Sequence, residues 1–159
     1  MKTRTITIKK KDVLFDIDAL TLAYANANIV DDAVRSNAVS SETDTTAGTR
    51  TFTRLADRRA AEIRTVMDMY ISHSTATTAN DTLSTSDYSF SLSIDDDFED
   101  SLLNPLTALM HDYIVKGTVS DWFGEIGVRG QQEALENEAK LLVPQMKELI
   151  YYRPVPQLS

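Results

Sequence analysis

The chain has 159 residues, a net charge of −8 and no cysteine. A chain of this length suits a single domain, 1–159, and can bury about two-thirds of its unfolded surface without disulfides or metals. The lack of cysteine excludes disulfides, thiolate metal sites and cysteine nucleophiles. No apolar run approaches the ~20 residues of a membrane helix, and the N-terminal segment MKTRTITIKKKD has no apolar core for a signal peptide. We therefore expect a soluble protein that is made inside a cell.

Two strands are predicted. Residues 3–9, TRTITIK, alternate around Ile6 and Ile8 and are rich in β-branched residues. Residues 87–94 also alternate, and their apolar members are Tyr88, Phe90, Leu92 and Ile94. Together the strands predict a small antiparallel ribbon, which needs helices on its apolar face to be stable.

The first strand leads into a basic run made of Lys9, Lys10 and Lys11. One interpretation is that these lysines protect a sheet edge from pairing with other chains. The other is that they form a docking patch for an anionic partner. Both interpretations make the three lysines candidate contact residues.

The next two elements are predicted helices. Residues 12–28 start at Asp12, a suitable N-cap, and carry a helical stripe made of Val13, Ile17, Leu20 and Tyr24. Residues 51–72 carry another, made of Phe52, Leu55, Ile63, Val66, Met67, Tyr70 and Ile71. Between them, 31–50 is poor in large apolar groups, so we expect a flexible loop with one helical turn at 32–37.

Two further helices are predicted towards the C-terminus. An acidic turn at 95–97 leads into a helix that we expect to end at Gly117. The last helix is expected over 131–152, with a kink at Pro144. The polar segment 74–86 is predicted to be a flexible loop and 153–159 an extended tail. The predicted class is mainly α, a bundle of about four helices with the two-stranded ribbon at 3–9 and 87–94.

The second helix carries a basic stripe. Arg50, Arg54 and Arg58 are four residues apart and share a face, and Arg59 and Arg64 lie nearby. The stripe could contact an acidic partner or a nucleic-acid backbone, or it could be a solvated surface paired with nearby acids. A pI near 4.7 argues against general duplex-DNA binding, so nucleic acid is expected only through such a local stripe.

The sequence contains no recognisable catalytic set. His73 and His111 have no second metal ligand at helical spacing, and His111 is expected to be a surface or hydrogen-bonded histidine. The acids near the first helix and those at 95–97 favour capping and turns over metal binding. We therefore predict no catalytic, cofactor or metal site. At the C-terminus, Tyr151, Tyr152 and Arg153 could form a docking arm.

The chain resembles small proteins encoded among the virion-structure genes of tailed phages and prophages of Bacteroidetes. The resemblance rests on TITI-K, YSFSLSI followed by an acidic helix start, GTVSDWF, and a last helix that ends in YYRPVP. It covers most of the chain outside 31–50 and 74–86. The chain departs from the pattern at Pro105 and Pro144, in helices that such proteins usually leave uninterrupted.

This resemblance implies a phage structural protein, such as a head–tail connector, neck or tail-completion component that assembles as a ring. Its partners would be itself and neighbouring virion proteins, and it would be found in the virion and, during assembly, in the host cytoplasm. The alternative is an acidic helical module of a bacterial host that binds a protein or a small ligand. A metal-dependent enzyme built on the acidic cluster and His111 is the third hypothesis.

Overall fold

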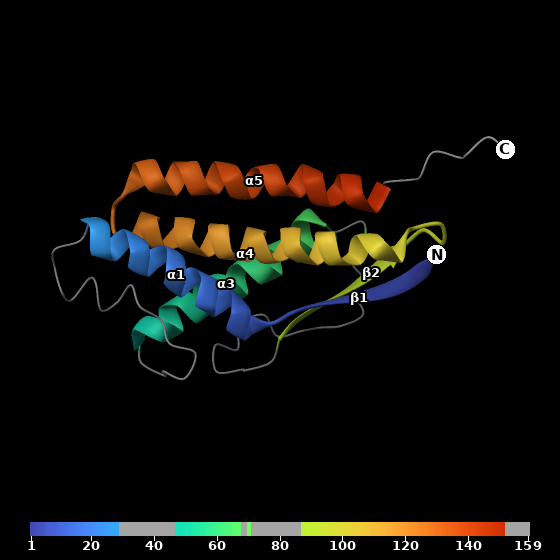
Figure 1. Cartoon of the computed structure of the whole chain (residues 1–159), viewed down its shortest axis with the longest axis horizontal. Coiled ribbons are helices and arrows are strands. Elements are labelled where there is room, and N and C mark those ends of the chain that lie inside the picture. Colours follow the sequence, from blue (N-terminus) through green and yellow to red (C-terminus); the bar gives the residue numbers. More distant parts are fainter. Residues whose placement is uncertain (29–46, 68–69, 71–86, 152–159) are drawn as a thin grey trace.

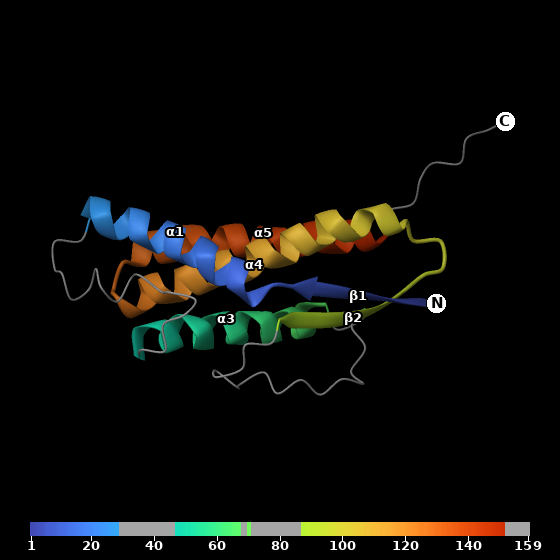
Figure 2. The same cartoon turned by 60° about the horizontal axis from the view of Figure 1, so that its bottom comes forward.

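The computed structural model describes residues 1–28, 47–67, 70 and 87–151, with the backbone alone at 25–28 and 47–51. In chain order, these residues form β1 (Lys2–Ile8), α1 (Lys10–Asn28), α3 (Ala47–Val66), β2 (Tyr88–Ile94), the 3₁₀ helix η1 (Asp100–Leu102), α4 (Leu103–Glu125) and α5 (Arg129–Tyr151). The helices α1, α3 and α5 surround α4 (Figures 1 and 2). The predicted class, mainly helical with a small antiparallel ribbon, is confirmed.

The ribbon joins the two predicted strands, each seven residues long. β1 and β2 pair antiparallel, with Lys2 opposite Ile94 and Ile8 opposite Tyr88. Alternate side chains face the helices, and the buried ones are Ile6, Ile8, Phe90, Leu92 and Ile94. The alternation in the sequence therefore correctly separated the buried face from the exposed one.

Helix α1 begins at Lys10 rather than Asp12, and one position of its predicted apolar stripe is wrong. Leu20 was expected in the core, but it is 45% exposed, and the neighbouring Thr21 is fully buried instead. The Thr21 hydroxyl donates a hydrogen bond to the carbonyl of Ile17 at 2.8 Å. This bond satisfies the hydroxyl and allows a polar side chain to occupy the core position.

Helix α3 is shifted towards the N-terminus relative to the prediction of 51–72. It starts at Ala47, within the predicted loop 31–50, and ends at Val66. A turn follows, in which the amide of Tyr70 donates to the carbonyl of Met67 at 2.9 Å. The predicted turn at 32–37, the loop 74–86 and the tail 153–159 lie outside the described residues.

Gly117 does not end α4, contrary to the prediction. The helix continues to Glu125, and Gly127, with φ of 81°, provides the left-handed turn that follows. Gly117 is instead needed for close contact with α3, because a Cβ atom there would lie 2.6 Å from Cδ of Arg59. A glycine inside a helix can thus indicate a place where a side chain of another helix packs directly against the helix backbone.

Both prolines lie within helices. Pro105 is the third residue of α4, in the first turn, where its missing N–H would have no helical acceptor. Pro144 lies well inside α5, which continues through it (Figure 1). The kink expected at Pro144 stays a prediction.

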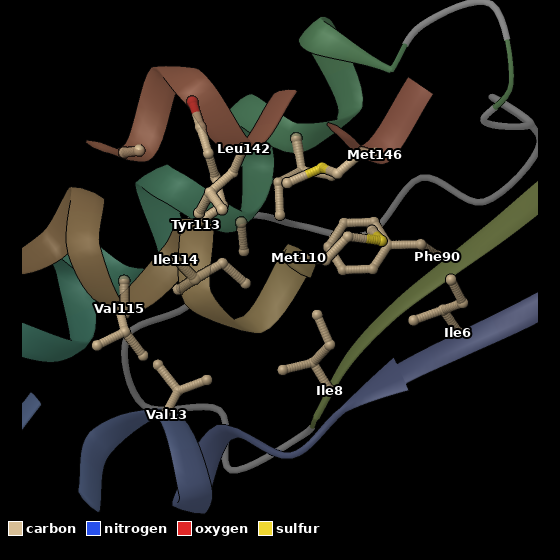
Figure 3. Close-up of a cluster of buried hydrophobic side chains, with 14 of the residues drawn as sticks. Ile6, Ile8, Val13, Phe90, Met110, Tyr113, Ile114, Val115, Leu142 and Met146 are labelled. Atoms are coloured by element: carbon tan, nitrogen blue, oxygen red, sulfur yellow. The ribbon is translucent and has the colours of Figure 1, made fainter. Parts of the chain in front are cut away.

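The core lies where the ribbon, α1, α3 and α5 meet α4 (Figure 3). Ile6, Ile8 and Phe90 point from the ribbon towards Met110 of α4, and Met146 approaches from α5 (Figure 3). All five are at most 2% exposed. A cluster with this degree of burial needs no cofactor or disulfide to account for a stable fold.

The proline inside α5 supplies the first prediction. Pro144 is exposed, so replacing it removes no core contact, while an alanine at this position would restore a backbone hydrogen bond and relieve a steric clash. Pro144→Ala should therefore raise the free energy of unfolding by about 1–3 kcal/mol in urea titrations followed by far-UV circular dichroism. Gln145→Ala is the control, and equal values for both variants would contradict the prediction.

Candidate contact surfaces

The structure separates the three predicted lysines. Lys9 and Lys11 are exposed, but Lys10 is only 7% exposed and points into the protein. Its Nζ lies 3.0 Å from Oδ1 of Asp57 on α3. A helix that starts directly after a strand turns successive side chains to different sides, so consecutive lysines cannot share one surface.

Lys10 and Asp57 belong to a buried polar cluster with Tyr88. The Tyr88 hydroxyl donates to Asp57 Oδ1 at 2.7 Å, and the Lys10 ammonium lies 5.5 Å from the centre of the Tyr88 ring. Burial, followed by the negative charge of Asp57, raises the pKa of Tyr88 and keeps it neutral. The cluster joins the start of α1 to α3 and β2, so it orients these elements rather than forming a surface.

The arginine stripe is also divided by the structure. Arg54 and Arg58 are exposed on α3, whereas Arg59 is 6% exposed and Arg64 is partly covered. Arg64 lies over the Phe90 ring, 4.9 Å from its centre. The Arg50 side chain is outside the described residues, so the basic surface that can be described consists of Arg54 and Arg58.

Arg59 connects three helices through carboxylates. Its guanidinium bonds both oxygens of Asp121 on α4, at 2.8 and 2.9 Å, and reaches Glu136 on α5 at 2.7 Å. It also donates to Glu62 of its own helix at 3.1 Å. Burial opposes the charge of Arg59, but the bonds to Asp121 and Glu136 outweigh it, and its pKa is raised. We call this group the Arg59 cluster.

His111 is hydrogen-bonded, as predicted. Its Nε2 lies 2.6 Å from Oδ2 of Asp16, which links α4 to α1. Beside it, an open groove of about 410 Å³ runs between residues 7–9 and α4. Among the described residues, no group of three or more His, Asp or Glu side chains is placed to share a metal ion. His73 lies outside them.

The predicted C-terminal contact residues are described only in part. Tyr151 ends α5, is 55% exposed, and places its ring edge-on to Tyr70 with the ring centres 5.5 Å apart. The contact joins α5 to the turn after α3, where the carbonyl of Tyr70 also accepts a bond from β2. Tyr152 and Arg153 lie outside the described residues.

Sequence reasoning missed two exposed apolar surfaces. On α1, Phe15 is 64% and Leu22 37% exposed, and Ala19 and Ala23 lie beside them; we call these four residues the α1 face. On α5, Leu141 is 65% exposed, with Ala134 and Pro144 exposed on the same side; we call these three the α5 face. For α1, the sequence did contain a sign of an exposed apolar face, because the apolar residues of this helix occur all around it rather than on one stripe.

Comparison of the chain with family models, with curated proteins and with solved structures finds no match. Among the described residues, no helix has both the length and the apolar character that crossing a bilayer requires. The structural basis for a function is therefore the set of surfaces described above.

The Arg59 cluster supplies the second prediction. A lysine at this position cannot form two parallel bonds to Asp121 while also reaching Glu136. Arg59→Lys should lower the free energy of unfolding by about 1–3 kcal/mol in urea titrations, whereas Arg58→Lys, at an exposed neighbour, should change it by less than about 0.5 kcal/mol. Equal effects of the two substitutions would contradict a role for the Arg59 cluster in stability.

The buried Tyr113 supplies the third prediction. Burial raises the pKa of Tyr113 from 10.0 to about 12. An unfolded chain ionises this tyrosine first, so the stability it contributes is complete below pH 10 and is lost as the pH rises through 12. Tyr113→Phe should therefore lose less stability between pH 9 and 12 than the wild type, by up to about 2 kcal/mol, in thermal melts at stepped pH. Parallel pH profiles would contradict this assignment.

Proposed function

We propose that this chain is a non-enzymatic structural protein of a tailed phage: a head–tail connector, neck or tail-completion component that acts through subunit contacts in a ring. Its partners would be copies of itself and neighbouring virion proteins. It would act in the virion and, during assembly, in the host cytoplasm. The resemblance in TITI-K, YSFSLSI, GTVSDWF and YYRPVP supports the phage assignment. The geometry of the exposed apolar faces supports assembly.

The observation that carries the proposal is the presence of two unlike apolar faces on one chain. The α1 face centres on Phe15, and the α5 face centres on Leu141. Because α1 and α5 pack on different sides of α4 (Figure 1), the two faces belong to helices on different sides of the molecule. A ring needs two different complementary patches on each subunit, one for each neighbour.

A rigid body between the two faces suits this role. The α4 helix carries α1 on one side and α5 on another, and the Arg59 cluster fixes α3, α4 and α5 relative to one another. A ring closes only if the angle between its two contacts is held, because small errors add up around the circle. Internal ion pairs and a continuous core supply that rigidity.

Single substitutions test the two faces. We expect the wild type to be monomeric or weakly associated when dilute and to form rings when concentrated or given its virion partner, as measured by light scattering. Phe15→Asp or Leu141→Asp should abolish the rings, because either charge would be buried without a partner. Thr65→Asp, at an exposed position on α3, is the control and should leave assembly unchanged.

Mixing the two variants gives a sharper outcome. Phe15→Asp keeps its α5 face and Leu141→Asp keeps its α1 face, so the mixture should join the two variants in pairs through one α5 face and one α1 face, without forming rings. Each variant should melt within a few degrees of the wild type, since both positions are exposed. A wild type that stays monomeric when concentrated and with its partner would overturn the proposal and favour the ligand-binding alternative.

A further inference from the structure

The two edges of the ribbon differ in their hydrogen bonding. On the outer edge of β2, the amide of Ser93 donates to the carbonyl of Tyr70 at 2.6 Å. On the same edge, the Arg64 guanidinium donates to the carbonyl of Ser89 at 2.7 Å. The turn after α3 and one side chain of α3 therefore cover this edge. Strand β1 provides the opposite edge.

These bonds determine where the backbone of β1 points. The Ser93 amide faces away from β1, so the pair of Thr3 with Ser93 is not hydrogen-bonded. Such pairs alternate along an antiparallel ladder, so Thr5 and Thr7 also turn their N–H and C=O groups to the outer edge. The Thr3 carbonyl accepts a bond from Arg4 at 3.1 Å. Within the part of the chain that the structure describes, the outward backbone groups of Thr5 and Thr7 have no protein partner.

Space is available beside this edge. The open groove of about 410 Å³ begins at Thr7 and is bordered on its far side by Asn104, Thr107 and Ala108 of α4. These α4 side chains are small or polar, and β1 runs on into α1 without α1 folding back over it (Figure 2). The groove therefore gives an added strand open space beside the Thr7 end of β1, and its other lining residues are Ile8, Lys9, Asp12, His111 and Asp112.

The two ends of the β1 edge also differ in the charge that surrounds them. Its start adjoins the acidic turn, where Asp96 pairs with the N-terminal ammonium at 3.1 Å and keeps 78% of its side chain exposed. Its end leads to the exposed Lys9. At this end three cations, the N-terminal ammonium, Lys2 and Arg4, pair with Asp96 and Asp100, and the acids of 95–100 outnumber them. A second β1 running antiparallel would place its own basic end beside this excess of negative charge. The same strand running parallel would place like charges together.

We infer that β1 is an interface with β1 of a second copy of this chain, paired antiparallel about a two-fold axis at Thr5. This register overlaps all seven residues of the strand and sets Thr3 against Thr7 of the partner. Every outward N–H and C=O then meets a complementary group, and the exposed face gains a row of threonine pairs. Arg4 faces Ile6 of the partner rather than another cation, and Lys9 approaches Asp96 of the partner.

A second copy fits this edge better than an unrelated extended peptide would. One two-fold rotation pairs the outward N–H and C=O groups of the two β1 strands and overlaps the strands along all seven residues. The same rotation brings each Lys9 towards Asp96 of the partner. The inference does not depend on the phage assignment. It also uses neither the α1 face nor the α5 face, so either proposal can fail while the other holds.

A charge swap tests the register. Lys9→Glu and Asp96→Lys should each weaken self-association by about tenfold in sedimentation equilibrium, because each places like charges at both two-fold contacts. An equimolar mixture of the two variants should regain the wild-type affinity, since the mixed dimer has Glu against Lys at one contact and Asp against Lys at the other. Lys147→Glu, an exposed position on α5 with the same change in charge, should behave as the wild type.

Amide exchange of the full chain locates the contact. As the concentration rises, the amides of Thr5 and Thr7 should become protected, whereas that of Ile6, which is bonded to β2, should be protected throughout. Running the experiment on Phe15→Asp as well separates this contact from the ring contact. Thr5→Pro, which removes an outward N–H, should abolish the protection of Thr7 while the circular dichroism spectrum stays native.

Three results would overturn the inference. The first is a chain that stays monomeric at every concentration in both backgrounds. The second is a dimer whose affinity is insensitive to Lys9→Glu and Asp96→Lys. The third is protection of Thr5 and Thr7 only when another protein is added, which would assign the edge to a different occupant.

Discussion

The structure depends on the enclosure of α4 by other elements. Its buried residues include Leu106, Met110, Ile114, Val119 and Trp122, which do not lie on one stripe, because α1, α3, α5 and the ribbon each cover a part of it. Small polar residues allow these close approaches. The Ser120 hydroxyl donates to the carbonyl of Gln132 at 2.9 Å and fastens the turn between α4 and α5. Because the other elements all pack on this central helix, their positions relative to one another depend on how each packs against α4.

Periodicity predicted the parts of the fold in which one apolar side meets one core. The ribbon residues alternate strictly, so the buried faces of the strands were predicted correctly. The buried α5 positions Ala139, Leu142, Met146 and Ile150 likewise recur at helical spacing. Element ends were less predictable. Gly117 and Gly127 look alike in the sequence as helix stop signals, but in the structure Gly127 has a positive φ and Gly117 packs against Arg59.

Two errors at the predicted contact surfaces share one physical cause: a polar side chain can be buried when its partner comes from elsewhere in the chain. Arg59 was expected at the surface beside the basic stripe, yet it is buried with carboxylates of α4 and α5 as its partners. Lys10 is buried because Asp57 meets it from α3. No local pattern reveals such partners. Of the candidate contact residues, Lys9, Lys11, Arg54, Arg58 and Tyr151 are exposed. The exposed Phe15 was overlooked because it looks like a core residue.

The aromatic cluster around Trp122 provides an optical probe. The chain has a single tryptophan, and its ring meets Tyr24 of α1 edge-on and Phe52 of α3, both with centres 6.1 Å away. Phe123 lies beside it, with centres 5.0 Å apart. Because three helices meet at this indole and only 4% of Trp122 is exposed, its emission should shift to longer wavelength when any of them separates. Intrinsic fluorescence can therefore report on the junction of α1, α3 and α4 without an added dye.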